Sequence, residues 1–515
     1  MKKRPNLLLL FTDMQRADTI GALGNPIIKT PALDRLAREG TAFTSAYTPS
    51  PVCVSARCSL HYGLMPGRTG CSENTPMMAD NGRSYPALLS SAGYRTHAIG
   101  KCHFTPDAYA LRGFQTRETQ EEGVSRSDYQ TFLLERGFDA YEPMGPRGEM
   151  YYLPQPSHLP QSVHPTQWVG DRACRFIEEA SGEKPWCLFT SFIHPHPPFT
   201  PPRPWHKLYR GPLMPMPRRA PDQGALLTSI NRIQNRYKYR DQGIDLNLLR
   251  CIKAYYYACI SFVDYQVGRI LGALEARGAL DETLVVFASD HGEFLGDFDC
   301  FGKRSMHDPS ARIPLLARAP ARFPAGARCE TPASLVDILP TFLAAAEVPA
   351  PASNDGRPAI DGVDLADLAS GARDRAGVGS QWSSGPNGQY LWVTRRWKYF
   401  YSAADRKEFL FDRVADPLEL RNMAGLSLVS KEKIALRGAL LNSLKKDGGV
   451  DAYTEENGQL SWKRHPAVVD GLQSGEVGEL FRQTELSDDP DAFLLFQDAP
   501  KADMPKAEGI GPYQT

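Results

Sequence analysis

Short runs of mostly apolar residues, each standing between longer polar or helical stretches, are the main pattern along this chain. The clearest are NLLLLF (6–11), YRTHAIG (94–100), WCLFTSFI (186–193) and LVVFAS (284–289). A strand of a parallel sheet is covered on both faces, so it is apolar throughout, whereas a half-exposed strand alternates. These runs therefore predict the strands of a mainly parallel sheet.

Helical periodicity fills much of the chain between the runs. It is clearest from Leu249 to Arg277, where apolar residues recur on one stripe and Gly278 supplies a stop. Shorter helices are expected at Thr30 to Glu39 and Thr166 to Ala180. Strands that alternate with helices indicate an α/β fold in which helices flank a central sheet.

The remaining segments divide the chain further. Residues 118–165 and 201–242 are rich in Pro, Gly, Tyr and charge, and we expect long excursions over a binding surface there. After Pro349, the short apolar segments LWVT, KYFYS and EFLFD predict a small antiparallel sheet, followed by a helix near 431–446. The predicted organisation is a main α/β domain (1–350), a subdomain with a sheet and a helix (351–446), and a C-terminal tail (447–515) that packs on the main domain or acts as an oligomerisation arm.

Composition excludes some partners. Lys plus Arg and Asp plus Glu both number 59, so no net field attracts nucleic acid or an anionic membrane, and a small-molecule substrate is expected. The apolar run after MKKRPN is too short for a signal peptide, and no stretch reaches transmembrane length. Ten cysteines without regular spacing favour reduced thiols and a cytoplasmic location.

Polar residues with catalytic potential follow each of the predicted strands. Ligands of open α/β sheets bind outside the carboxyl ends of the strands, so these side chains should converge in one crevice. Two carboxylates, several imidazoles and a lysine there predict a site for a metal and an anion. The residues concerned are Asp13, Lys101, His103, His194, His196, Asp290 and His291.

The segment PSPVCVSARCSLHYG (49–63) adds a nucleophile candidate. Pro51 and Gly63 bracket a short predicted helix that begins near Cys53, where free backbone N–H groups favour an anion. Cys53 and Arg57 are four residues apart and share one helix face. Spacing alone leaves Cys53 open as a metal ligand, a redox thiol or a nucleophile.

The pattern C-x-x-x-R in this segment resembles the signature of the type I sulfatases, in which a maturation enzyme oxidises the cysteine to formylglycine. Further similar stretches run through residues 1–425, namely FTDMQRADTIGALGNP, GKCHF, SFIHPHPPF, SDHGEFLGD with Lys303, and FLFDRVADPLELRNMA. The resemblance, which extends to the phosphonate monoester hydrolase branch, implies an alkaline-phosphatase-like sandwich. It also implies hydrolysis of sulfate esters.

Roles for individual residues follow from the resemblance. Asp13, Asp290, His291 and the oxygen of modified Cys53 would bind one divalent cation, Ca²⁺ or alternatively Mn²⁺. One hydroxyl of the aldehyde hydrate would attack sulfur and displace the alcohol, and loss of a proton from the other would then expel sulfate and regenerate the aldehyde. The remaining assignments are oxyanion stabilisation by Arg57 and Lys101, the base of the elimination at His103, and the leaving oxygen at His196 and Lys303, with His194 as the competitor of His196.

Two positions depart from the family pattern. Met14 stands where many relatives have an Asp, Asn or Gln that reaches the metal, so either Gln15 compensates or the site has fewer protein ligands. Ser55 replaces the proline of the maturation signature.

Two other functions compete with sulfate ester hydrolysis. A phosphonate monoester or phosphodiester hydrolase would use the same nucleophile and metal pair. A non-catalytic binding protein would result if Cys53 stayed a thiol. The chain does not reveal which alcohol its natural ester carries.

Overall fold

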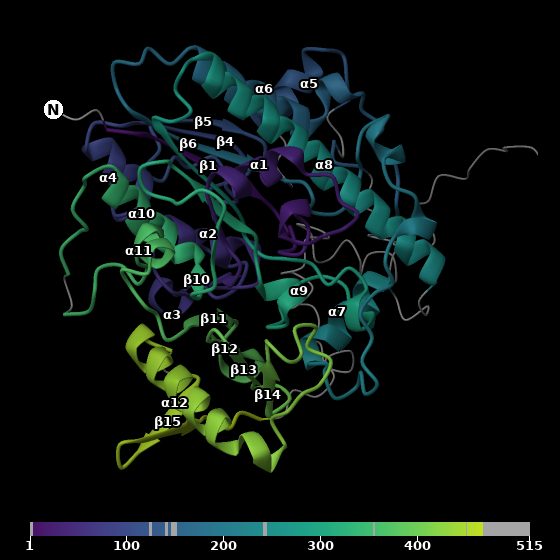
Figure 1. The fold of residues 1–515 in the computed structure, drawn as a ribbon, viewed down its shortest axis with the longest axis vertical. Coiled ribbons are helices and arrows are strands. Elements are labelled where there is room, and N and C mark those ends of the chain that lie inside the picture. Colours follow the sequence, from purple (N-terminus) through teal and green to yellow (C-terminus); the bar gives the residue numbers. More distant parts are fainter. Residues whose placement is uncertain are drawn as a thin grey trace, which may run out of the picture. The chain divides into compact units, whose positions relative to one another are not determined.

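The computed structural model describes residues 4–122, 126–139, 143–145, 152–239, 245–353, 356–449 and 451–466. Its centre is an eight-stranded sheet with the strand order β5-β4-β6-β1-β7-β8-β2-β9 (Figure 1). Strand β8 runs antiparallel to both of its neighbours, and the other adjacent strands pair in parallel. The strands are β1 (Asn6–Thr12), β2 (Thr41–Phe43), β4 (Arg95–Gly100), β5 (Thr116–Thr119), β6 (Trp186–Phe192), β7 (Thr283–Ser289), β8 (Leu315–Arg318) and β9 (Ala327–Cys329).

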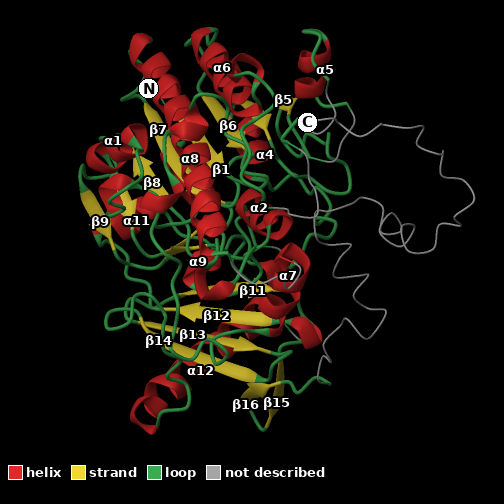
Figure 2. Ribbon diagram, turned by 90° about the vertical axis from the view of Figure 1, so that its right-hand side faces the viewer, coloured by secondary structure: helices red, strands yellow, loops and turns green. Residues whose placement is uncertain are grey.

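The four predicted parallel strands are confirmed as the middle of this sheet, in the order β4, β6, β1 and β7. Figure 2 shows β6, β1 and β7 within the sheet. Each of the four strands is buried along nearly its whole length, which explains why the runs are apolar on both faces. The predicted α/β fold with a mainly parallel sheet is therefore correct.

Alternate residues of β1 enter different cores. Leu8 and Leu10 pack in a cluster with α1 (Pro31–Glu39), α6 (Pro165–Glu178) and α8 (Leu246–Ala276). Leu7 and Leu9 pack on the opposite face with α2 (Cys53–Tyr62), α4 (Tyr85–Ser91) and α10 (Ile338–Ala345). The sheet is thus the middle layer of a sandwich, as the period of two in a strand requires.

The three long predicted helices are confirmed as α1, α6 and α8, and Gly278, at φ 61°, follows the last turn of α8. The predicted excursions contain the helices α5 (Asp128–Leu134) and α7 (Ser229–Tyr239), and part of both segments lies outside the described residues. Shorter elements are α3 (Pro66–Thr69), α9 (Asp308–Ala311), α11 (Leu365–Ser370), β3 (Ala46–Tyr47) and β10 (Ala333–Ser334).

A second, antiparallel sheet occupies the C-terminal part of the described chain. It consists of β11 (Val378–Trp382), β12 (Gln389–Val393), β13 (Trp397–Ser402) and β14 (Lys407–Asp412), and α12 (Ser430–Asp447) packs against it. The small sheet and its helix are confirmed, whereas β11 was not predicted. The boundaries of the three proposed domains stay a prediction.

A hairpin that the sequence did not suggest follows α12. Strands β15 (Tyr453–Glu456) and β16 (Gln459–Trp462) pair, and the Trp462 ring stacks on Tyr401 with 4.2 Å between ring centroids. The rest of the predicted tail, 467–515, lies outside the described residues. None of the ten cysteines, all of which lie in the described part of the chain, is joined in a disulfide. Within the described ranges, no helix combines the length and apolar character of a membrane span.

Candidate active site

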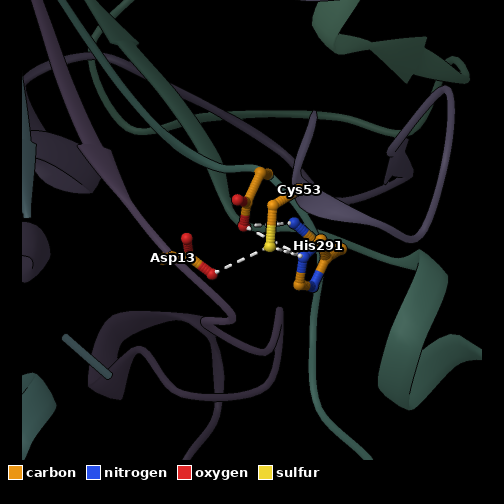
Figure 3. A group of neighbouring side chains, drawn as sticks. Asp13, Cys53 and His291 are labelled. Atoms are coloured by element: carbon orange, nitrogen blue, oxygen red, sulfur yellow. Dashed lines mark hydrogen bonds and ion pairs between the residues drawn. The ribbon is translucent and has the colours of Figure 1, made fainter. Parts of the chain in front are cut away.

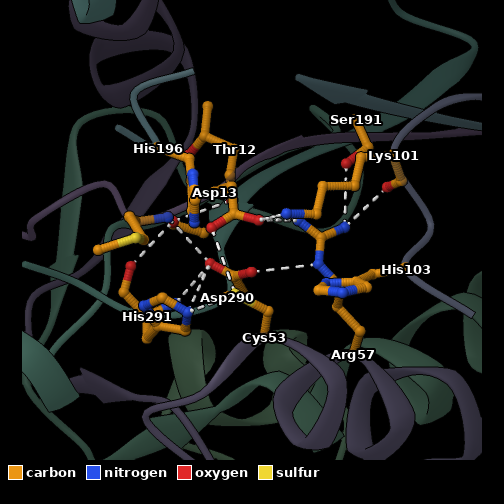
Figure 4. Close-up of polar contacts among 12 residues, drawn as sticks. Thr12, Asp13, Cys53, Arg57, Lys101, His103, Ser191, His196, Asp290 and His291 are labelled. Carbon is orange, nitrogen blue, oxygen red and sulfur yellow. Dashed lines mark hydrogen bonds and ion pairs between the residues drawn. The ribbon is translucent and has the colours of Figure 1, made fainter. Parts of the chain in front are cut away.

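The carboxyl ends of the central strands bring polar side chains from distant segments together (Figure 4). Asp13 follows β1, Lys101 follows β4, and Asp290 follows β7. Because these parallel strands all end at the same edge of the sheet, the three side chains lie close together. Helix α2 contributes Cys53 and Arg57 to the same cluster.

Cys53 is the first residue of α2 and is fully buried. Its Sγ lies 3.1 Å from Nε2 of His291 and 3.6 Å from Oδ1 of Asp13 (Figure 3). It also lies 2.8 Å from Nζ of Lys303. Burial and the nearby carboxylates of Asp13 and Asp290 raise the pKa of this thiol well above its ordinary value, against the opposing effect of Lys303. The unmodified thiol is therefore protonated and a poor nucleophile.

Asp13, Cys53, Asp290 and His291 form a group of potential metal ligands whose donor atoms all lie within 4.8 Å of one another. His291 Nδ1 lies 3.0 Å from the carbonyl oxygen of Gly292, so Nδ1 carries the hydrogen and Nε2 presents its lone pair to the group. Two carboxylates and one imidazole suit a divalent cation, since carboxylate oxygens are hard donors.

The two carboxylates of this group have different electrostatic surroundings. Burial, with the neighbouring charge of Asp13, raises the pKa of Asp290 to about 6. Burial acts in the same direction on Asp13, but Lys101, His196 and Arg57 outweigh it and hold the pKa of Asp13 well below its ordinary value. Two buried carboxylates this close repel each other, so a cation between them would relieve the repulsion.

The guanidinium of Arg57 links the ends of four strands, β1, β4, β6 and β7. It donates to Asp13 at 3.2 Å and to Asp290 at 3.1 Å, and it also donates to the carbonyl oxygen of Lys101 and to Oγ of Ser191 (Figure 4). The planar fork thus fixes both carboxylates from one side, as arginine does better than lysine.

Lys101 is buried between two carboxylates. Its Nζ lies 2.8 Å from Oδ2 of Asp13 and 2.5 Å from Oε2 of Glu122. The other carboxylate oxygen of Glu122 lies 3.4 Å from Nδ1 of His196. Glu122 was missed in the sequence because it belongs to no motif and follows a short polar strand.

His103 follows Lys101 in an unusual backbone conformation with φ 55°, which two hydrogen bonds to the Glu121 carboxylate stabilise. Burial and the positive charges of Lys101 and Arg57 lower the pKa of His103 to about 3. Its imidazole is therefore neutral. Figure 4 shows the ring beside Arg57.

His194 and His196 have different neighbours in the structure. His194 Nδ1 lies 2.9 Å from Oγ1 of Thr166, and its ring stacks on His164. Burial lowers the pKa of His194 to about 3. His196 instead belongs to the cluster with Glu122, so of the two it is the histidine beside the candidate site.

The departure at Met14, and the neighbouring Gln15 that could compensate for it, also have an observed arrangement. The Met14 thioether lies 3.6 Å from Lys303 Nζ, and the Met14 N–H donates to Oδ1 of Asp290. The side-chain N–H of Gln15 donates to Oγ1 of Thr19, while its Oε1 is buried without a hydrogen-bond partner among the described residues. Met14 therefore adds no oxygen ligand.

The sandwich fold and a buried group of potential metal ligands around a residue at a helix N-terminus define a class of α/β hydrolases with a candidate metal centre. Within this class the chain belongs to the sulfatase family, whose profile matches residues 5–348. A second profile, N-sulphoglucosamine sulphohydrolase C-terminal, matches residues 296–446. The chain is thus a sulfuric ester hydrolase, and the predicted family is confirmed.

Individual relatives agree with this assignment. An arylsulfatase of Clostridium perfringens is 29% identical over 88% of this chain and 97% of its own length. A choline-sulfatase of Rhizobium meliloti is 30% identical over 82% of each chain. Among solved structures, the phosphonate monoester hydrolase of Agrobacterium radiobacter has a TM-score of 0.73 and 24% identity over 90% of this chain and 100% of its own. The last likeness shows the shared fold.

Proposed function

We propose that this chain hydrolyses sulfate esters with Cys53 as the nucleophilic position after its conversion to formylglycine. The supporting observation is the place of the Cys53 Sγ, which lies against potential metal ligands on one side and against the ammonium of Lys303 on the other. A hydroxyl in that place would have a cation to polarise it and a positive charge to meet the incoming ester. An unmodified thiol with a raised pKa would be a weak substitute.

The proposed cation is Ca²⁺, held by Asp13, Asp290 and His291, with Mn²⁺ as the alternative that the missing oxygen ligand at Met14 favours. Such an ion neutralises sulfate oxygens and makes a bound hydroxyl more acidic. The chain itself fixes the ligands, because Arg57 holds both carboxylates and the Gly292 carbonyl holds the imidazole.

The basic residues of the site are assigned by the same geometry. Arg57 and Lys101 are proposed to stabilise the transferring oxyanion, and the neutral ring of His103 is proposed to accept the proton that regenerates the aldehyde. His196 and Lys303 are proposed to surround the leaving oxygen, where one of them donates a proton. A maturation enzyme is the partner that this proposal requires.

Phosphonate monoester or phosphodiester hydrolysis is the rival function, since a phosphonate monoester hydrolase shares the fold. The test uses protein whose formylglycine content has been verified and compares 4-nitrophenyl sulfate with 4-nitrophenyl phenylphosphonate and bis(4-nitrophenyl) phosphate. The leaving group and the single negative charge are the same in all three, so kcat/KM reports the transferring group. We expect sulfate to exceed both phosphorus esters by at least about tenfold. A higher kcat/KM for either phosphorus ester would overturn the proposal.

A further inference from the structure

Glu122 is a largely buried carboxylate beside the candidate site that neither the motifs nor the proposed chemistry uses. It follows β5, and its side chain is 10% exposed. Its two oxygens contact different groups, since Oε2 lies 2.5 Å from Lys101 Nζ and Oε1 lies 3.4 Å from His196 Nδ1. An anion in a site for an anionic ester opposes substrate binding, so its presence calls for a compensating role.

We propose that Glu122 is a positioning residue: one carboxylate oxygen orients His196 toward the leaving oxygen, and the other anchors Lys101. This inference rests on the proposed function, in which His196 serves the leaving group.

The contacts of His196 fix which of its nitrogens can react. Nδ1 lies 2.8 Å from the carbonyl oxygen of Pro197 and 3.4 Å from the Glu122 carboxylate. Both neighbours are hydrogen-bond acceptors, so Nδ1 carries a hydrogen and Nε2 is the nitrogen that exchanges a proton with substrate. A carboxylate behind the imidazole fixes the tautomer and the ring orientation.

Lys101 receives its position from the same carboxylate. Its ammonium lies between Asp13 and Glu122, at 2.8 and 2.5 Å, so neither carboxylate alone sets its place. Charge-assisted contacts of this kind are short and directional. Glu122 therefore links Lys101, which contacts the potential metal ligand Asp13, to His196, which is proposed to serve the leaving group.

His194 provides an internal comparison. It lies two residues before His196 and is equally buried, yet its Nδ1 faces the hydroxyl of Thr166 instead of a carboxylate. Only one of these two neighbouring histidines thus has the acidic partner that a proton donor requires.

A matched control exists on β5. Glu118 also pairs with a histidine and a basic residue, at 3.5 Å to His97 Nε2 and 3.1 Å to Arg172 Nε. His97 stacks on Phe176 of α6 rather than facing Cys53. Glu118→Gln therefore removes a carboxylate from a similar pair without touching the candidate site.

The experiment measures kcat for a series of aryl sulfates, from 4-nitrophenyl to phenyl, with wild type, Glu122→Gln, Glu118→Gln, His196→Ala and the Glu122→Gln/His196→Ala double variant. A proton donor matters most for the poorest leaving group, so we expect Glu122→Gln to lose about 5-fold with 4-nitrophenyl sulfate and about 100-fold with phenyl sulfate. The double variant should lose much less than the product of the two single losses, because Glu122 and His196 act together on the leaving oxygen, and only the contact of Glu122 with Lys101 is lost in addition. Glu122→Asp should recover part of the loss.

A loss that is equal for all leaving groups, an additive double variant, or a Glu122→Gln profile identical to that of Glu118→Gln would each overturn the inference. Circular dichroism and the thermal midpoint of each variant establish that it is folded, and Glu122→Asp carries the same test if Glu122→Gln does not fold. Wild-type turnover of the sulfate series is measured first. If wild type prefers phosphonates, the proposed function fails by itself, and the same leaving-group series made with phosphonates tests Glu122.

Discussion

Two lysines, Lys101 and Lys398, have almost the same surroundings in different parts of this molecule. Both side chains are fully buried, and each ammonium lies between two carboxylates at distances of 2.5 to 2.8 Å. Lys101 follows β4 at the carboxyl ends of the parallel strands, whereas Lys398 lies on β13 of the antiparallel sheet. Their differences show what distinguishes an ion pair in a candidate active site from a structural one.

The ion pairs of Lys398, called here the Lys398 centre, connect separate segments of the chain. Its Nζ contacts Asp308 at the start of α9 and Glu419 in the loop after β14, and the Tyr47 hydroxyl and the Asp308 N–H complete the network. These contacts connect the antiparallel sheet to the main domain. No potential metal-ligand group is described around Lys398 among the residues that the structure covers.

The Lys101 centre has additional groups that face the ion pair. Asp13 contacts Lys101 and also lies beside the Sγ of Cys53, and Asp290 adds a second carboxylate to the same group. A buried ion pair by itself is thus weak evidence of function. A nucleophilic position and converging metal ligands make the Lys101 centre the active-site candidate.

The largest effect is expected when the nucleophile that distinguishes the Lys101 centre is removed. Cys53→Ala should lower kcat by about 10⁵-fold or more, because alanine supplies neither an attacking hydroxyl nor an oxygen for the metal. The thermal midpoint should stay near that of wild type. Cys53→Ser should form a covalent sulfate ester that does not turn over, which intact mass reports. If Cys53→Ala kept the wild-type rate, the nucleophile would no longer distinguish the Lys101 centre from the Lys398 centre.

Metal removal should affect only the Lys101 centre. Dialysis against a chelator should lower the activity by about 10³-fold, since a cation contributes several kcal/mol to such transition states. Adding Ca²⁺ at about 100 times its Kd should then raise the free energy of unfolding by about 2.7 kcal/mol. The matched controls are Asp290→Asn, which should lose this response, and Asp308→Asn, which should keep it. A response lost in Asp308→Asn but kept in Asp290→Asn would reverse the assignment.

Replacing each lysine by methionine should separate chemistry from stability. Lys101→Met should lower kcat/KM by about 10²- to 10³-fold, as loss of one oxyanion stabiliser does. Lys398→Met leaves two buried carboxylates without their cation and should lower the free energy of unfolding by about 3 to 5 kcal/mol, with unchanged activity per folded molecule. Urea unfolding and steady-state kinetics measure both quantities. Equal activity losses in the two variants would contradict the comparison.

The smallest effect concerns the pH dependence of the Lys398 centre. Burial, with the charge of Asp308, raises the pKa of Glu419 from 4.5 to about 7. The folded state therefore binds the Glu419 proton more tightly than the unfolded state, and this stability is present below pH 4.5 and lost as the pH rises through about 7.

The corresponding measurement compares wild type with Glu419→Gln in urea at several pH values. Wild type should lose at most about 3 kcal/mol relative to the variant across that window. Parallel stability curves would show that Glu419 does not titrate there.

Most of the fold could be predicted because the central strands are buried on both faces and are therefore apolar. The missed elements lack that signal. Strand β5 reads TRET at one edge of the sheet, and the hairpin strands β15 and β16 read YTEE and QLSW. Their strand character depends on pairing partners, which no local pattern records.

The candidate site was predictable to the extent that its residues end strands or belong to motifs. Asp13, Lys101 and Asp290 follow apolar runs, so the topology brings them to one edge. Glu122 carries no such mark, because its importance depends on contacts with Lys101 and His196 across the fold. Lys398 likewise reads as part of a strand, and its burial is explained only by two distant carboxylates.

The state of Cys53 tests the central claim most directly. Mass spectrometry of the peptide that contains this residue, taken from protein of measured activity, distinguishes formylglycine from cysteine by a loss of about 18 Da, an oxidation outside the usual cysteine ladder. Our account predicts that sulfate ester turnover in separate preparations rises in proportion to the fraction of peptide with this loss, and that it vanishes where the fraction is zero. Full activity in protein that carries only the unmodified thiol at Cys53 would contradict it.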